Sequence, residues 1–115
     1  MNPVATTMFE LFQSKKDKHF YFHLKAANGE VILSSQGYKE KAGCEKGIES
    51  VKTNAPDDKN YIIKEATDGR QFFNLNAANG QVIGTSQMYQ SASGLKTGIE
   101  SVKNNAPGAS TQEIG

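Results

Sequence analysis

The sequence contains the same segment twice. Residues 22–56 and 73–107 align without a gap at an offset of 51, and 21 of the 35 aligned positions are identical. Agreement of this kind indicates duplication of one structural unit. Because each copy has only about 50 residues, which is marginal for independent stability, we expect the copies to share a core. The prediction is a single domain over residues 1–115, with repeats at about 9–56 and 61–107.

The pattern of apolar residues predicts the same order of elements in each copy. Apolar and polar side chains alternate between residues 20 and 25, as in a half-buried strand. Apolar runs at 9–12 and 31–33 predict two more strands. A helix over about residues 40–54 would present one apolar face formed by Cys44, Gly47, Ile48, Val51 and Ala55.

This order predicts an α+β fold made of two tandem β-β-β-α repeats with pseudo-two-fold symmetry. The strands are expected to join into one antiparallel sheet, with both helices packed against one face. Gly43 and Gly47, and their equivalents Gly94 and Gly98, recur within the predicted helices. Because glycine is unfavourable inside a helix, these pairs predict close packing of each helix on the sheet.

Charge and composition exclude several classes of function. The formal net charge is +1, and Asp17 interrupts the only cluster of lysines, Lys15 to Lys18. There is therefore no general electrostatic case for binding nucleic acid or an anionic membrane. No apolar run approaches the ~18 residues of a membrane helix. With one cysteine and no signal-peptide pattern, the expected location is the cytoplasm.

The paired motif AANGxVIxxSQxY and GIESVKxNAP occurs in both copies. It resembles the YegP-like family of small uncharacterised bacterial proteins over about residues 9–107. The resemblance implies two β-β-β-α units joined in one sheet, and leaves open whether the halves exchange a strand. Single-copy relatives would form the same object as dimers, so a monomeric, fused pseudo-dimer is expected here. The family brings no established activity and no catalytic residues.

The two ends of the chain lie outside the motif. Residues 1–7 and 108–115 are expected to be flexible tails. The alternative for the second tail is a last edge strand over residues 111–114.

The titratable residues form no known catalytic or metal-binding motif. His19 and His23 lie four apart on a predicted strand, about 13 Å from each other by strand rise, too far to share a metal. Cys44 falls on the buried helix face, where a small core residue is expected. Glu49 and Glu100 each precede a lysine by three residues, as in a helix-surface ion pair. The sequence therefore predicts no cofactor and no metal site.

The remaining candidate site is the outer face of the sheet. Antiparallel sheets often have one solvated face, and aromatic and hydrogen-bonding groups there would form a recognition surface. These positions differ between the copies, whereas the alternating core positions are identical. An ordinary solvated face would show the same divergence. The candidate binding face consists of Tyr21, His23, Lys25, Phe72, Asn74 and Asn76.

Three hypotheses for function follow from these patterns. The first is a small, non-enzymatic binding or protein-interaction module, whose expected partner is a protein. The second is nucleic-acid binding through the sheet face and the turn at residues 15–18. The third is an enzyme with a site in a groove between the repeats, where Tyr38 and Tyr89 precede the helices. These tyrosines are instead expected to cover the edge of the core.

The recurring Asn-Gly pairs generate a prediction about the turns. Asn28-Gly29 and Asn79-Gly80 lie between apolar runs and predict type I′ hairpins. We expect Gly29→Val and Gly80→Val each to lower the free energy of unfolding by more than about 1 kcal/mol, because a β-branched residue resists positive φ. Urea melts measure this loss, and unchanged melting curves would contradict positive φ at these glycines.

Overall fold

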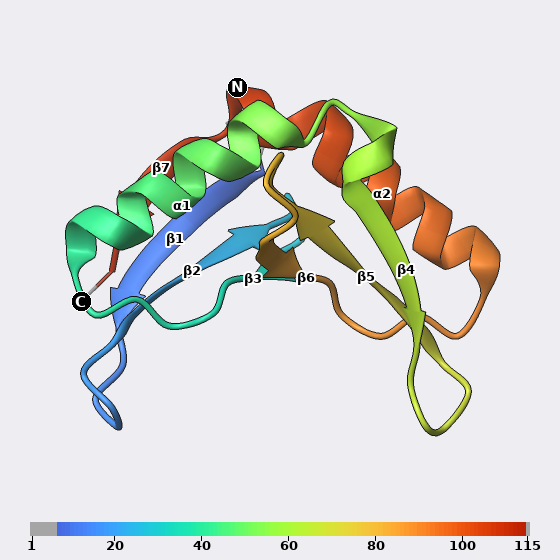
Figure 1. The fold of residues 1–115 in the computed structure, drawn as a ribbon, viewed down its shortest axis with the longest axis horizontal. Coiled ribbons are helices and arrows are strands. Elements are labelled where there is room, and N and C mark those ends of the chain that lie inside the picture. The colour runs from blue at the N-terminus through green and yellow to red at the C-terminus, as the bar shows by residue number, and fades with distance from the viewer. Residues whose placement is uncertain (1–6, 115) are drawn as a thin grey trace.

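Two helices cover one face of a seven-stranded sheet in the computed structural model, which describes residues 7–114 (Figure 1). The strands are β1 (Met8–Gln13), β2 (Phe20–Lys25), β3 (Val31–Ser34), β4 (Tyr61–Glu65), β5 (Gln71–Asn76), β6 (Val82–Thr85) and β7 (Ser110–Glu113). The helices are α1 (Lys41–Asn54) and α2 (Ala92–Asn105), followed by the 3-10 turns η1 (Asp58–Asn60) and η2 (Ala106–Gly108). The predicted α+β class and the order β-β-β-α in each copy are confirmed. Among the described residues, no helix is long and apolar enough to cross a membrane.

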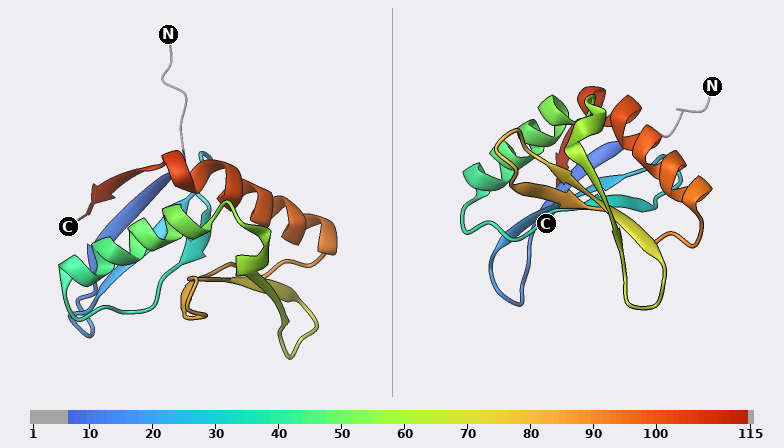
Figure 2. Two further views of the ribbon diagram at one scale, coloured as in Figure 1. Left: turned by 45° about the horizontal axis from the view of Figure 1, so that its top comes forward. Right: turned by 45° about the vertical axis from the view of Figure 1, so that its right-hand side comes forward.

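The strand order shows the predicted pseudo-two-fold symmetry. The sheet runs β4-β5-β6-β3-β2-β1-β7, so the last strands of the two copies meet in the middle. There β3 and β6 pair antiparallel through Ser34 and Thr85, which are equivalent positions at the offset of 51. The pseudo-two-fold axis therefore passes beside this pair. The sheet twists strongly, and the β1–β2 and β4–β5 hairpins project as two arms (Figure 2).

The junction of the copies depends on one large and one small residue. Leu33 and Gly84 occupy equivalent positions next to the axis. A Cβ atom on Gly84 would lie 2.7 Å from both Cγ and Cδ2 of Leu33. The Leu33 side chain thus fills the space that a second side chain would need, and both residues are buried.

The C-terminal segment corrects two expectations. Residues 108–115 are not a flexible tail throughout, because Ser110–Glu113 form β7, which pairs in parallel with the outer edge of β1. The sheet is therefore mixed rather than wholly antiparallel. The outer edge of β1 offers unpaired backbone N–H and C=O groups, and β7 forms by hydrogen bonding to them, so its sequence needs no apolar pattern. Because β7 follows the helix of the second copy and joins the first, the copies do share a strand. The expected flexibility at residues 1–6 lies outside the described residues.

The core lies between the helices and the sheet, and it contains the predicted residues. The alternating positions of β2 and β5 and the apolar stripe of α1 are buried. The helices are not buried alike: Ile48 is 2% exposed, whereas its equivalent Ile99 is only partly buried. The largest fully buried side chains are Phe9, Leu11, Phe22, Leu24, Leu33, Ile48, Val51, Phe73, Leu75 and Val102.

The helical glycines admit a tyrosine ring rather than a neighbouring backbone. A Cβ on Gly47 would lie 2.8 Å from Cζ of Tyr38, and one on Gly98 would lie 2.6 Å from Cζ of Tyr89. Each ring also stacks on a core phenylalanine of its own copy, with Tyr89 and Phe73 centroids 6.3 Å apart. Close packing therefore occurs at Gly47 and Gly98, where a tyrosine side chain fills the space, whereas Gly43 meets Tyr38 only at an ordinary 3.5 Å.

The Asn-Gly turns have positive φ at glycine but are not type I′. Gly29 and Gly80 have φ values of 88° and 87°, whereas neither asparagine has positive φ. Asparagine acts through its side chain instead: Oδ1 of Asn28 accepts the backbone N–H of Glu30 at 2.9 Å, and Asn79 does the same in the second copy. The type I′ prediction was wrong, but the strain expected from Gly29→Val remains.

The tyrosine–glycine contact gives a stability prediction. Gly98→Ala should destabilise the protein by about 1–2 kcal/mol, because overlap with the Tyr89 hydroxyl outweighs the gain in helix propensity. Tyr89→Phe should cost little by itself, since this hydroxyl is buried without a hydrogen-bond partner in the described structure, and it should recover part of the loss in the double variant. A double-mutant cycle in urea measures the coupling.

The control is Gly43→Ala, where the new Cβ meets Tyr38 at an ordinary 3.5 Å. It should stabilise the helix or leave it unchanged. Equal effects of Gly43→Ala and Gly98→Ala would contradict the proposed contact.

Candidate binding face

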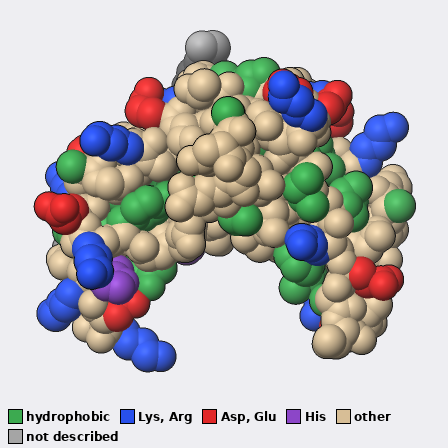
Figure 3. All heavy atoms as spheres, in the orientation of Figure 1, with side chains coloured by type: hydrophobic (Ala, Val, Ile, Leu, Met, Phe, Trp, Pro, Cys, Tyr) green, Lys and Arg blue, Asp and Glu red, His purple; other side chains and the backbone are tan. Residues whose placement is uncertain are grey.

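The side of the sheet away from the helices, here called the open face, is hollowed between the two hairpin arms (Figure 3). Cross-strand pairing aligns its side chains in rows that cross the pseudo-two-fold axis. The central row consists of Glu10, His23, Ser34, Thr85, Asn74 and Ile62. One row thus crosses six strands, from β1 to β4, and joins both copies.

All six predicted residues point to the open face, but they form two groups. Tyr21, His23 and Lys25 lie on β2, and Phe72, Asn74 and Asn76 lie on β5. Each is partly buried. Strands β3 and β6 separate the groups, and Ser34 and Thr85 connect them in the central row.

The first group is an aromatic cluster that includes Phe12. The Phe12 ring stacks on Tyr21, with centroids 5.9 Å apart, and meets His23 edge-on at 4.9 Å. Burial lowers the pKa of His23 below its ordinary value of 6.5, with a smaller contribution from Lys25. Sequence reasoning missed Phe12, although the alternation of Phe9 and Leu11 with Glu10 and Phe12 contained the signal.

Lys25 is not a free cation on this surface. Its Nζ lies 2.8 Å from Oε1 of Glu10, which comes from the neighbouring strand β1. The Glu10 side chain is 17% exposed and that of Lys25 is 33% exposed. This ion pair reduces the attraction of the first group for anions, so it argues against nucleic acid on this side.

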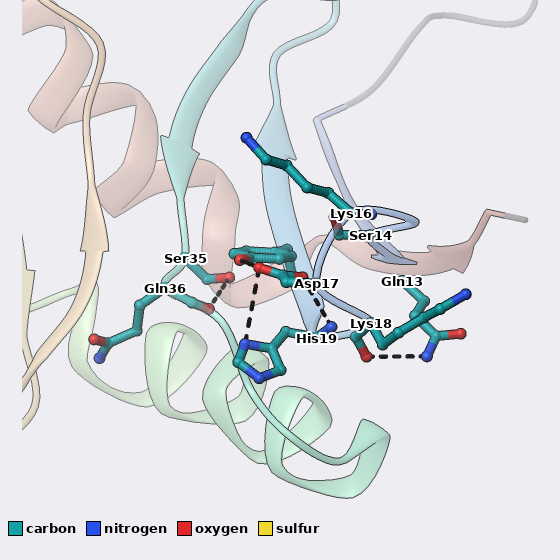
Figure 4. A network of polar contacts seen from close by, with 9 residues as sticks. Gln13, Ser14, Lys16, Asp17, Lys18, His19, Ser35 and Gln36 are labelled. Atoms are coloured by element: carbon teal, nitrogen blue, oxygen red, sulfur yellow. Dashed lines mark hydrogen bonds and ion pairs between the residues drawn. The ribbon is translucent and has the colours of Figure 1, made fainter.

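The β1–β2 turn, in which Figure 4 shows Asp17 next to His19, holds Tyr21 through Asp17. Its hydroxyl donates to Oδ2 of Asp17 at 2.6 Å, and Oδ1 of Asp17 accepts the backbone N–H of His19 at 2.9 Å. The Tyr21 hydrogen bond is the main cause that lowers the pKa of Asp17, and the same bond raises the pKa of Tyr21. Lys18 has a φ of 65°, which keeps the turn compact. The turn therefore orients Tyr21 on the open face.

The second group is chemically different. Asn74 accepts a hydrogen bond from the Thr85 hydroxyl at 2.9 Å. Oδ1 of Asn76 is buried without a partner among the described residues. Ile62 and Lys64 occupy the places that Glu10 and Phe12 hold in the first copy. The aromatic cluster and ion pair are therefore replaced by amides beside an exposed aliphatic side chain.

The other titratable candidates have structural roles. Burial raises the pKa of the Cys44 thiol to about 11, which opposes nucleophilic reactivity. Glu49 pairs with Lys52 at 3.5 Å, and Glu100 pairs with Lys103 at 3.7 Å. Within residues 7–114, no three His, Cys, Asp or Glu side chains are grouped to hold a metal ion.

The tyrosines proposed for a groove between the copies do not converge. Tyr38 pairs through its backbone with Phe20, and Tyr89 pairs with Gln71. Each tyrosine lies within its own copy, at the start of β2 or β5 and under its own helix. The structure thus explains both without a shared site.

The fold and face define a class: a duplicated α+β domain with one helix-covered and one open sheet face. The family described as "Domain of unknown function (DUF1508)" matches residues 15–61 and 66–113, one match in each copy. The chain belongs to this family, also designated UPF0339 and YegP-like.

The relatives match over nearly their whole length. The "UPF0339 protein in ptx operon 5'region" of Stutzerimonas stutzeri is 52% identical over 107 residues, which are 93% of this chain and 96% of the relative. "UPF0339 protein YegP" of Escherichia coli K12 is 53% identical over 97 residues, or 84% and 87% of the two chains. The names of these proteins assign no activity.

Two solution NMR structures share the fold. The protein of unknown function yegP from E. coli has a TM-score of 0.88 and 46% identity, covering 97% of this chain and 96% of that one. UPF0339 protein SO3888 from Shewanella oneidensis has a TM-score of 0.87 and 44% identity, covering 94% and 91%.

The environment of His23 predicts a pH dependence of stability. Because burial lowers its pKa in the folded state, the unfolded chain binds more protons near the ordinary pKa, and stability rises with pH. Stability should therefore decrease between about pH 7.5 and about pH 5. His23→Asn, which introduces the residue found at position 74, should reduce that decrease. Urea melts of the wild type and H23N at both pH values measure it, and an identical decrease in H23N would contradict this role.

Proposed function

We propose that this protein is a small, non-enzymatic binding module that recognises a partner protein through the open face. The expected compartment is the cytoplasm, which fits a single thiol held unreactive in the core. The copies supply one rigid sheet, and the open face supplies the varied side chains.

This proposal rests on one observation: the two copies have the same backbone fold, but their open-face side chains differ in chemical type. Several equivalent positions that face the core keep the same residue, such as Phe22 and Phe73 or Leu24 and Leu75. On the open face, Phe12, Tyr21 and His23 form an aromatic cluster on one side, while the other side carries amides and Ile62. Partly buried aromatic side chains give large contact area at little cost in entropy. A partner crossing the axis would contact both surfaces.

The proposal that the protein is not an enzyme is supported by the structural roles of the groups that could act in catalysis. His23 packs on Phe12, Tyr21 bonds to Asp17, and Cys44 fills the core. General acid–base or nucleophilic catalysis needs a group whose pKa is matched to the operating pH. A nucleophilic cysteine needs a lowered pKa, whereas burial raises the pKa of Cys44.

The proposal is tested by capture with surface variants. The face variant carries Tyr21→Ser, His23→Ser and Phe72→Ser, and the matched control carries Glu45→Ser, Lys46→Ser and Thr53→Ser on the exposed side of α1. Each immobilised protein is incubated with bacterial lysate, and bound proteins are quantified by mass spectrometry. We expect a partner retained by the wild type and the control to fall at least tenfold with the folded face variant.

Two outcomes would contradict the proposal. Equal recovery by a folded face variant would place the site elsewhere. Recovery that is abolished by nuclease would favour the nucleic-acid hypothesis instead. Circular dichroism and urea melts establish that each variant is folded.

A further inference from the structure

One outer edge of the sheet is covered and the equivalent edge is not. In the first copy, β7 lies along the outer edge of β1. By the pseudo-two-fold symmetry, β4 is the equivalent of β1, yet β4 is the last strand on its side of the sheet. The described structure thus has seven strands where complete symmetry would give eight.

The fusion of the copies explains the missing strand. At the offset of 51, residues 59–62 are the equivalents of β7 (Ser110–Glu113). These residues follow α1 as β7 follows α2, but Lys59 and Asn60 belong to η1, and Tyr61 and Ile62 already form the start of β4. One segment cannot be both the connection into the second copy and the cover of its outer edge. The chain therefore has no spare segment at this point to place beside β4.

The uncovered edge leaves an apolar strip exposed. Leu11 in β1 is 2% exposed, whereas Ile63, which has the equivalent pairing partner in β5, is 54% exposed. Ile48 of α1 is likewise 2% exposed, whereas Ile99 of α2 is only partly buried. In the covered copy, Ile48 borders a small pocket together with Thr111 of β7. The strip formed by Ile63 and Ile99 therefore matches the surface that β7 covers in the first copy.

The covered edge shows which side chains an added strand would present. Thr111 and Glu113 face the helix: Thr111 lies beside Glu45, Ile48 and Glu49, and Glu113 pairs with Lys41.

The equivalent residues of the second copy change this chemistry. Lys96 replaces Glu45, and Ala92 replaces Lys41. An acidic side chain at the first helix-facing position would meet Lys96, while Glu100, the equivalent of Glu49, is paired with Lys103. An aliphatic one, two residues later, would meet Ala92 and Ile63.

We propose that the β4 edge binds an extended segment of a partner protein, which adds to the sheet parallel to β4 as β7 does to β1. The segment carries an acidic residue and, two residues later, an aliphatic residue, both facing α2. Backbone hydrogen bonds supply affinity in such strand addition, and the alternate side chains supply specificity. This edge is separate from the centre of the open face, so the two sites can be tested independently.

The probe is a synthetic peptide of residues 107–115 that carries Thr111→Glu and Glu113→Val. It is titrated to millimolar concentration into the ¹⁵N-labelled full-length protein, and the unsubstituted peptide is titrated for comparison. We expect saturable shifts of the amide signals of β4 and of Ile99, with at least threefold weaker binding of the unsubstituted peptide. Ile63→Lys should weaken binding at least tenfold. Val82→Lys, which changes an exposed residue of the central strand β6, should leave it unchanged.

Several results would overturn the proposal. Absence of saturable shifts would do so, as would shifts confined to β1 or to the centre of the open face. Concentration-dependent shifts of β4 without peptide, together with a dimer in sedimentation, would identify a second copy as the occupant instead.

Discussion

The joined sheet depends on the contact between Leu33 and Gly84 at the pseudo-two-fold axis. Within residues 7–114, β3 and β6 connect the two copies through one cross-strand pair, Ser34 with Thr85. Beside it, the missing side chain of Gly84 leaves the space that Leu33 fills. Equivalent residues meet near a two-fold axis, so two leucines at these positions would compete for one volume. The divergence of this one pair lets the copies share a core.

Other residues that hold the fold together are the same in both copies, whereas residues on the open face differ. Tyr38 and Tyr89 fit against Gly47 and Gly98 in the same way, which explains why both elements of the contact occur in each copy. On the open face, the contacts of Tyr21, Lys25 and Asn74 are specific to one copy, and the residues at these positions differ between the copies. Packing within the fold therefore determines the identity of few of the side chains that a partner would contact.

The sequence was sufficient for features that depend on local periodicity. The alternation around Phe22 and the stripe containing Ile48 identified the strands, the helices and their buried sides. It was insufficient where tertiary context decides: β7 has no apolar pattern and forms because β1 offers unpaired backbone groups, and Ile99 is less buried than Ile48 because β7 covers only the first copy. The alternation also placed Tyr21 and Phe72 on the side of the sheet away from the core, while the Lys25–Glu10 ion pair and the role of Phe12 required knowledge of which strands are neighbours.

The position of β7 has a consequence for assembly. An edge strand is a template for further strands, and a molecule with two open edges on opposite sides can add copies without closure. Removing residues 109–115 would make β1, with its apolar Phe9 and Leu11, the edge strand opposite β4, where the intact chain has the polar β7. In the intact chain, β7 ends one side with exposed polar side chains, and Lys64 and Glu65 place charge on the other. The last strand thus also limits linear polymerisation.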